Sequence, residues 1–270
     1  MFDTGANATH ARVWQRPDGR LVADITAAAD HDAALTHLRF VLAVDDDTSA
    51  FTESIRDDAL LSRAVHARGT RPTRTTTVAH AVLKAFAGQL ITAREAMLIE
   101  RRVIDRIGRT HAGLAMPPDQ DALASLTVAD YTACGLNPKR ASALCRLIRH
   151  VDLEALRTET AERLTARLLR ERMIGPWTVG VIALGGLGRY DLGLAGDLNL
   201  IRLSANLLGR PATAEDSERL LERYDPWAGL ASIHLMRHPL ARERRHPRAD
   251  DDLGTARSAG RPRRRMGGGR

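Results

Sequence analysis

The sequence predicts a mainly α-helical chain, α+β overall, in which a small antiparallel sheet precedes an all-helical body. Two observations support this fold class. Residues 13–23 place strand-forming side chains on either side of Pro17-Asp18-Gly19, a turn sequence typical of a β-hairpin. From Thr76 onward, apolar residues recur at intervals of three and four, which is typical of amphipathic helices.

The sheet is expected to belong to an N-terminal domain of residues 1–65. A helix at about Asp32–Leu38 and a short strand at Phe40–Val44 are its other predicted elements. The longest apolar run of the chain is far shorter than the about 20 residues that cross a membrane. Met1–Thr4 also lacks the basic and apolar regions of a signal peptide. We therefore expect a cytoplasmic protein with no membrane partner.

Residues 66–238 are expected to form the helical body. Val78, Val82 and Phe86 share one face of its first helix, which breaks at Gly88. The segment Thr92–Glu95 matches a capping box and predicts the start of the next helix. Later helices are expected at or near Thr127, Asn137, Leu164, Asp197, Ala214 and Pro226.

The charge of the chain is concentrated at its carboxyl end. Residues 237–270 hold eleven arginines and four acidic residues, which equals the whole formal net charge of +7. We expect residues 239–270 to be a disordered arginine-rich tail, because glycine and like charges dominate the last ten positions. Such a tail is either a nonspecific DNA tether, through its affinity for phosphate, or a solvated segment without a role.

The segment Ile174–Thr178 is the most informative about function. Gly175 permits an unusual backbone angle and Pro176 suits the first position of a helix. Backbone N–H groups at such a helix start can bind a DNA phosphate. A glycine run at 185–188 then ends the helix, and a glycine-containing loop leads to Asp197 at the start of another apolar helix.

This order of helix, hairpin, helix, glycine-rich loop and aspartate resembles the helix-hairpin-helix DNA glycosylases. Within that superfamily, the chain is similar to the bacterial 3-methyladenine-DNA glycosylase II group, which removes alkylated bases. The resemblance covers roughly 11–238. Further matching segments are Leu42–Asp47, Asp57–Leu61, Gly69–Pro72, Gly88–Ile91, Gly135–Ala141 and Tyr224–Trp227. Compared with the family, the chain starts too late to supply the first strands of the N-terminal sheet, so that sheet is expected to be incomplete.

The resemblance assigns the catalytic role to Asp197. A fixed carboxylate beside the sugar stabilises the positive charge that develops as the base departs, and it can orient water. The alternative is that Asp197 only caps the helix that follows it. Bifunctional relatives carry a lysine where this chain has Trp177, and no lysine follows Lys139. The resemblance therefore implies a monofunctional hydrolase without strand-cutting activity.

The base pocket implied by the resemblance contains Trp177, Val181 and Met236. Trp177 is expected to stack on the flipped base, with core packing as the alternative role. Val181 and Met236 stand where similar proteins have aromatic residues. An electron-rich ring attracts a cationic alkylated base, so their loss is expected to reduce or redirect the preference for such bases.

Two other groups of residues are implied to contact DNA. Gln89 and Leu90 correspond to a wedge that fills the space left by the extruded base. The alternative for Leu90 is a buried contact between helices. Met173, Gly175 and Thr178 correspond to the phosphate-binding hairpin, although Met173 replaces the first glycine of the usual hairpin.

No cofactor is expected to be required. In similar proteins the hairpin carbonyls hold a monovalent cation, and here Leu169, Glu171 and Met173 align with those carbonyls. The two cysteines, Cys134 and Cys145, indicate no disulfide framework or zinc site. They also exclude the four-cysteine iron–sulfur cluster of some helix-hairpin-helix glycosylases.

The sequence thus predicts a monofunctional DNA glycosylase of base excision repair, which would flip an alkylated base and hydrolyse its N-glycosidic bond. Its expected partner is double-stranded DNA with a damaged base, its expected state is a monomer, and its expected location is the nucleoid. The alternative is a non-catalytic helix-hairpin-helix DNA-binding protein with a decayed base pocket. The retained Asp197 favours the enzyme, whereas the missing pocket aromatics favour the alternative.

Overall fold

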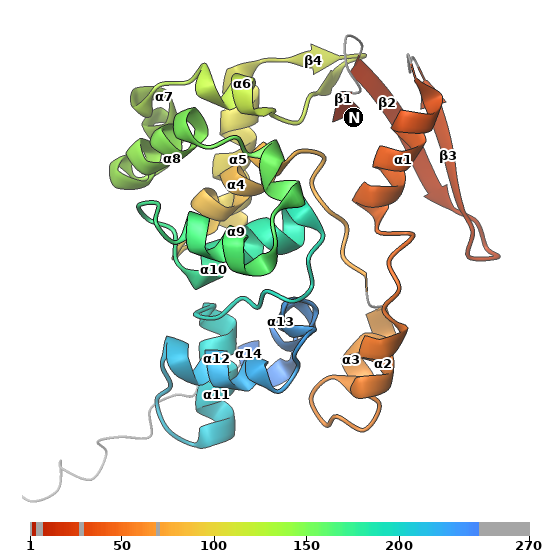
Figure 1. Cartoon of the computed structure of the whole chain (residues 1–270), viewed down its shortest axis with the longest axis vertical. Coiled ribbons are helices and arrows are strands. Elements are labelled where there is room, and N and C mark those ends of the chain that lie inside the picture. Colours follow the sequence, from red (N-terminus) through yellow and green to blue (C-terminus); the bar gives the residue numbers. More distant parts are fainter. Residues whose placement is uncertain (1, 4–7, 27–29, 69–70, 243–270) are drawn as a thin grey trace, which may run out of the picture.

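The structure is a computed structural model that describes residues 2–3, 8–26, 30–68 and 71–242. It is mostly helical, with a small antiparallel sheet at one corner (Figure 1). The fold class predicted from the sequence is therefore confirmed. None of the helices in the described ranges is long and apolar enough to cross a membrane.

The elements follow one another in this order. The strands are β1 (Phe2–Asp3), β2 (Ala8–Gln15), β3 (Leu21–Thr26), β4 (Thr110–His111) and β5 (Leu114–Ala115). The first helices are α1 (His31–Leu42), α2 (Ser49–Ser54), α3 (Ser62–Arg68), α4 (Val78–Gly88), α5 (Ala93–Ile107), α6 (Gln120–Ala124), α7 (Val128–Ala133) and α8 (Pro138–His150). The later ones are η1 (Glu154–Thr158), α9 (Ala161–Leu168), α10 (Pro176–Ile182), η2 (Ala183–Leu187), α11 (Leu198–Leu208), α12 (Ala214–Glu222), α13 (Ala228–Leu235) and α14 (Pro239–Arg242).

The predicted β-hairpin is present. β2 and β3 pair antiparallel, with Val13 opposite Ala23, and β1 adds a short third strand on the other edge of β2. Gly19 has a φ of +84°, a left-handed conformation that glycine adopts without strain, so the turn at 17–19 closes tightly. The helix α1 packs on this hairpin through Leu38.

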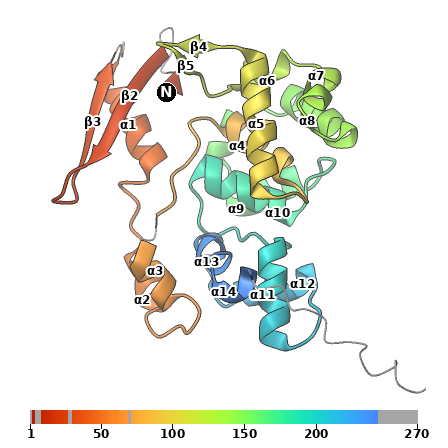
Figure 2. The same ribbon diagram turned by 180° about the vertical axis from the view of Figure 1, so that it is seen from behind.

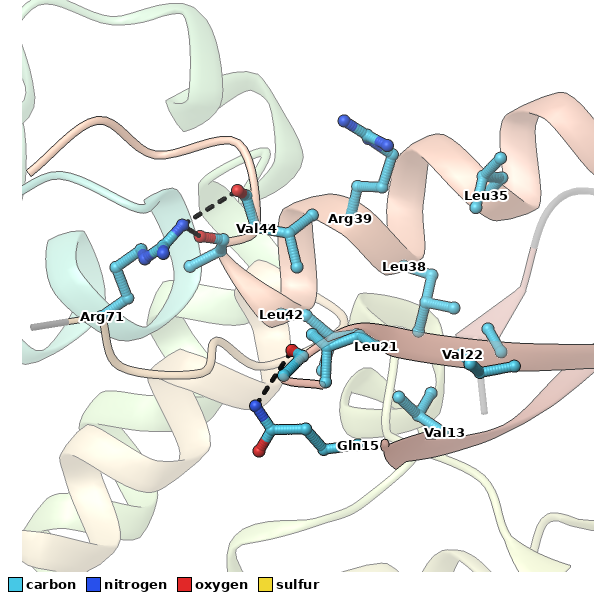
Figure 3. A pocket seen from close by; sticks show the side chains of 13 residues that line it. Val13, Gln15, Leu21, Val22, Leu35, Leu38, Arg39, Leu42, Val44 and Arg71 are labelled. Carbon is cyan, nitrogen blue, oxygen red and sulfur yellow. Dashed lines mark hydrogen bonds between the residues drawn. The ribbon is translucent and has the colours of Figure 1, made fainter. Parts of the chain in front are cut away.

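The predicted strand at Phe40–Val44 is wrong. α1 continues to Leu42, because Leu35, Leu38 and Leu42 extend its apolar face at the three- and four-residue spacing of a helix. It then ends at Ala43, which has a left-handed φ of 53° and whose N–H bonds the carbonyls of the last turn. An open cavity of about 490 Å³ lies between the hairpin and α1 (Figure 3). None of the predicted site residues lines it.

The helical body is built around α4, which is buried on almost every side. Thr77 caps its start, and the predicted capping box of Thr92 and Glu95 opens α5. Thr127 and Asn137 likewise cap α7 and α8, as predicted. The body also contains an unpredicted hairpin, β4–β5, whose turn residues Ala112 and Gly113 both have positive φ.

A second core cluster joins distant parts of the chain. Phe51, Leu61 and Val65 pack in one cluster with residues of α11, α12 and α13. Figures 1 and 2 show α2 and α3 at the same end of the molecule as these late helices. The domain boundary expected at residue 65 therefore falls inside a packed cluster.

A buried arginine connects the N-terminal part to the helical body. Arg74 donates to the Phe40 carbonyl at 2.9 Å and to the Tyr190 hydroxyl at 3.3 Å, and it forms an ion pair with Asp46. Burial and the hydrogen bond to Asp46 raise the pKa of Tyr190 to about 12, so its hydroxyl stays protonated and able to donate. Tyr190 lies in the loop that leads to Asp197.

The first four residues of the expected tail are folded. Residues 239–242 form α14, Ala241 is fully buried, and the Asn206 side chain donates to the Leu240 carbonyl at 2.6 Å. These four residues are therefore part of the folded protein. The rest of the expected tail, 243–270, lies outside the described residues.

Phe51→Ala tests the second cluster. Because Phe51 is fully buried among α13 residues, the substitution should lower the free energy of unfolding by about 3–5 kcal/mol. Leu114→Ala is the control, since Leu114 is 55% exposed, and it should change stability by less than about 0.5 kcal/mol. Urea denaturation measures both. Equal, small effects would show that α2 does not contribute to the core.

Candidate active site

The helix-hairpin-helix unit is formed by α9, residues 169–175 and α10. Gly175 is the N-cap of α10 and Pro176 occupies its first turn, as predicted. The prediction of an unusual backbone angle at Gly175 is wrong, because its φ of −114° and ψ of 179° are ordinary extended values. The left-handed residue is Met173, with a φ of 63°. Met173 stands where the family has a glycine, so this turn keeps the glycine conformation at the cost of some backbone strain.

The position of α10 depends on a close backbone approach. A Cβ atom on Gly180 would lie 2.4 Å from the carbonyl oxygen of Gly193, so only glycine fits there. This contact places α10 directly against the loop that carries Asp197. The loop ends at Gly196, whose φ of 87° turns the chain into α11.

Asp197 is the N-cap of α11, and two donors hold its carboxylate. The Asn199 backbone N–H donates to one oxygen at 2.8 Å, and the Trp177 indole Nε1–H donates to the other at 3.0 Å. The residue is half-buried. Capping and a catalytic role are therefore compatible, because capping fixes the carboxylate without enclosing it.

Trp177 reaches Asp197 from the first turn of α10. Its ring lies against the end of α4, where a Cβ atom on Gly88 would be 3.1 Å from the indole Cη2 atom. The indole is thus held between the turn after α4 and the carboxylate. Trp177 remains partly exposed, so one part of its surface is free to contact a ligand.

Val181 and Met236 lie with Trp177 at the surface of the second core cluster. All three are half-buried and pack against this cluster. Their joint role as a base pocket stays a prediction. The walls that Val181 and Met236 contribute are aliphatic, and Trp177 is the aromatic member of this trio.

The turn between α4 and α5 presents one side chain to solvent. Leu90 is 79% exposed and has a left-handed φ of 55°, so the alternative of a buried contact between helices is wrong. The expectation that Gln89 is also exposed is wrong, since only 8% of it is accessible. A protruding single side chain on a strained turn is typical of a functional position.

Gln89 is bound to the hairpin instead. Its side-chain amide nitrogen donates to the Met173 carbonyl at 2.7 Å and lies 3.1 Å from the Thr178 hydroxyl. The amide oxygen is buried with no hydrogen-bond partner among the described residues.

These contacts change the expected roles of two hairpin residues. Thr178 is buried and its hydroxyl faces Gln89, so its side chain is not available to a phosphate. Met173 is 46% exposed, and its carbonyl already accepts from Gln89. Of the other carbonyls aligned with a cation site, that of Glu171 accepts from the Ile174 N–H at 3.3 Å.

The close approach at Gly180 and the burial of Gln89 were not predicted from the sequence. A glycine inside an otherwise apolar helix signals a close backbone approach, and Gly180 carries that signal. No comparable signal marks Gln89, because its partners lie 84 and 89 positions away. Its contact depends on tertiary packing of α4 against α10.

Comparisons with solved structures identify the fold. The described arrangement matches 3-methyladenine DNA glycosylase from Archaeoglobus fulgidus with a TM-score of 0.76 and 20% identity, over 87% of this chain and 84% of the other. The chain has the fold of the helix-hairpin-helix DNA glycosylases. An 8-oxoguanine glycosylase/lyase from Clostridium acetobutylicum shares this fold with a TM-score of 0.65 and 14% identity, over 83% and 86% of the two chains. At these identities the likeness concerns the fold.

Sequence comparison points to one group within this fold. The chain is homologous to a probable bifunctional transcriptional activator/DNA repair enzyme AlkA from Mycobacterium tuberculosis, with 28% identity over 256 residues. That match covers 87% of this chain and 51% of the relative, so the chain spans about half the length of the curated relatives it matches. No protein-family model matches the sequence. The resemblance inferred from the sequence motifs is thereby confirmed.

Gly180→Ala tests the close approach of α10. The added methyl group has no room beside the Gly193 carbonyl, so we expect a loss of about 1–3 kcal/mol in unfolding free energy and a displaced Asp197 loop. Gly185→Ala is the matched control, since a Cβ there meets nothing within 4 Å. Urea denaturation reports the first effect, and near-ultraviolet circular dichroism, to which Trp177 contributes, reports the second. Equal stability of the two variants would contradict the close packing.

Proposed function

We propose that the protein is a monofunctional DNA glycosylase of base excision repair, which flips an alkylated base out of double-stranded DNA and hydrolyses its N-glycosidic bond. One observation carries the proposal: the Asp197 carboxylate is fixed by two donors and joined to Trp177 at the edge of the second core cluster. An acid held beside an aromatic ring is the arrangement that this reaction requires.

The chemistry follows from the charge that develops on the sugar. As the bond to the base breaks, the deoxyribose becomes positively charged, and a preorganised carboxylate stabilises it electrostatically. Because Asn199 and Trp177 already hold the Asp197 oxygens, the carboxylate does not need to reorient during the reaction. The same group is positioned to orient the attacking water.

The absence of a lysine in this part of the sequence supports hydrolysis without strand cleavage. Trp177 occupies the position at which bifunctional glycosylases carry the lysine that forms a Schiff base. The sequence contains no lysine after Lys139. Without an amine at the sugar, no covalent imine forms, and the product is an intact strand with an abasic site.

An alkylated base is the proposed substrate. Trp177 offers a ring face for stacking, and Val181 and Met236 offer apolar walls. The names of similar proteins agree with this class, since they include a DNA repair enzyme AlkA and a 3-methyladenine DNA glycosylase. Fewer aromatic walls should weaken the attraction for cationic bases relative to an aromatic pocket.

Duplex DNA is the proposed partner, bound by a monomer in the nucleoid of the cytoplasm. The 79% exposure of Leu90 supports an intercalating role for its side chain, and the hairpin before α10 is proposed to bind a phosphate. A 3-methyladenine DNA glycosylase of Schizosaccharomyces pombe, solved in complex with abasic DNA, has the same fold with a TM-score of 0.58 and 21% identity, over 69% of this chain and 94% of the other.

Asp197→Asn should remove most base release while leaving folding and DNA binding nearly intact. Asparagine caps a helix about as well as aspartate, whereas loss of the charge should slow excision about a hundredfold or more. Release of labelled alkylated bases from duplex DNA measures the rate. Asp30→Asn, which changes the cap of α1, is the matched control and should excise at the wild-type rate. Excision by Asp197→Asn at that rate would remove Asp197 from the catalytic role, whereas no base release by the wild type would favour a non-catalytic DNA-binding protein.

Leu90→Ala should weaken binding to a duplex with an abasic-site analogue more than binding to intact duplex. Filling the vacated stack helps only after a base has left it, and extrusion costs a few kcal/mol. Fluorescence anisotropy with both duplexes gives the two affinities. Leu208→Ala, also at an exposed leucine, should leave both affinities unchanged. Equal losses for Leu90→Ala on the two duplexes would contradict the wedge role.

A further inference from the structure

We propose that the side-chain amide of Gln89 takes the place of a hairpin cation in this protein. It would thereby fix the turn between α4 and α5, which carries Leu90, to the phosphate-binding hairpin. Gln89 is thus a positioning residue, and Leu90 alone enters the DNA. The contacts of Gln89 come from the structure, and their effect on DNA binding rests on the proposed function.

The geometry leaves one orientation of the amide. A backbone carbonyl only accepts hydrogen bonds, so the Gln89 group 2.7 Å from the Met173 oxygen must be the NH₂ group. The same nitrogen lies 3.1 Å from the Thr178 hydroxyl. The Gln89 side chain is 8% exposed and its amide oxygen has no partner within the described ranges. The buried amide therefore links the turn after α4 to the hairpin through its nitrogen.

Two of the three carbonyls aligned with a cation site, those of Met173 and Glu171, already accept hydrogen bonds here. The Met173 carbonyl accepts from the Gln89 amide at 2.7 Å. The Glu171 carbonyl accepts from the Ile174 N–H at 3.3 Å. A cation would have to share both oxygens with hydrogen-bond donors that point at them. A neutral NH₂ group already partners the oxygen of the left-handed Met173, so the turn needs no ion at this point.

The amide also joins two segments that act on DNA. Leu90 follows Gln89 directly and has a left-handed φ of 55°, so the direction of its side chain depends on where Gln89 is held. Met173 and Thr178 flank the start of α10, where the phosphate is proposed to bind. If the Leu90 turn and the hairpin are already fixed in the free protein, they lose less conformational entropy when the protein binds DNA. The free energy of binding is then more favourable.

The test uses Gln89→Met, which keeps the length of the side chain and removes its donor. We measure the affinity of the full chain for duplex DNA with a tetrahydrofuran abasic-site analogue by fluorescence anisotropy, in potassium chloride and in tetramethylammonium chloride at equal ionic strength. Wild-type affinity should be the same in both salts. Gln89→Met should bind about tenfold more weakly in tetramethylammonium, because the Met173 oxygen lacks a donor, and potassium should restore part of the loss.

Gln120→Met is the matched control. The Gln120 amide also donates to two backbone carbonyls, those of Ile148 and Val151, at 2.7 and 2.8 Å. This variant should lose thermal stability but keep wild-type DNA affinity in both salts. A wild-type affinity that falls several-fold in tetramethylammonium would overturn the proposal, and so would a Gln89→Met variant whose DNA affinity matches that of Gln120→Met.

A double-mutant cycle with Leu90→Ala tests the link to the wedge. If Gln89 acts partly through Leu90, Gln89→Met should weaken binding less in the Leu90→Ala background than in the wild type. Full additivity would show that Gln89 does not position the wedge. Binding to the abasic analogue requires no base release, so an inactive wild-type protein with the expected salt and coupling behaviour would contradict the proposed function alone.

Discussion

The placement of α10 is the constraint on which the rest of the site depends, and glycine contacts determine it. Gly180 touches the backbone of the Asp197 loop, and Gly186 in η2 would place a Cβ 2.7 Å from Ala81 of α4. On the other side, Trp177 of α10 rests on Gly88 at the end of α4. A Cβ atom at Gly180 or Gly186 would clash, and one at Gly88 would press tightly on the indole. α10 is therefore held on both sides at short range.

This placement connects all parts of the proposed site through direct contacts. Leu90 is adjacent to Gln89, which bonds the hairpin and Thr178. Trp177 precedes Thr178 and bonds Asp197. The wedge, the hairpin, the ring and the carboxylate thus form one continuous chain of packed groups. Each is held by a neighbour that itself has a part in the proposed reaction, so their relative positions are preorganised.

Local signals in the sequence predicted much of this structure. The turn at 17–19, the capping boxes and the Gly175-Pro176 helix start depend on neighbouring residues, and these predictions agree with the structure. The strand expected at Phe40–Val44 failed because a helical face extends further than the apolar run suggested. The exposure of Gln89 failed for a different reason. Its partners are remote in sequence, and a family pattern describes the position of a residue without describing its hydrogen bonds.

The second core cluster has a consequence for the order in which the protein assembles. Phe51 and Leu200 belong to this cluster although about 150 residues separate them, and the α4–α10 body lies between them in the chain. Closing so long a loop costs conformational entropy. Packing of α2 against the late helices offsets that cost, and it can form only after those helices have been synthesised. During synthesis, the α4–α10 core can pack while α2 still lacks its partners. Asp197 and Met236 follow the hairpin in the chain, so an unfinished chain holds the hairpin before it holds the complete proposed site.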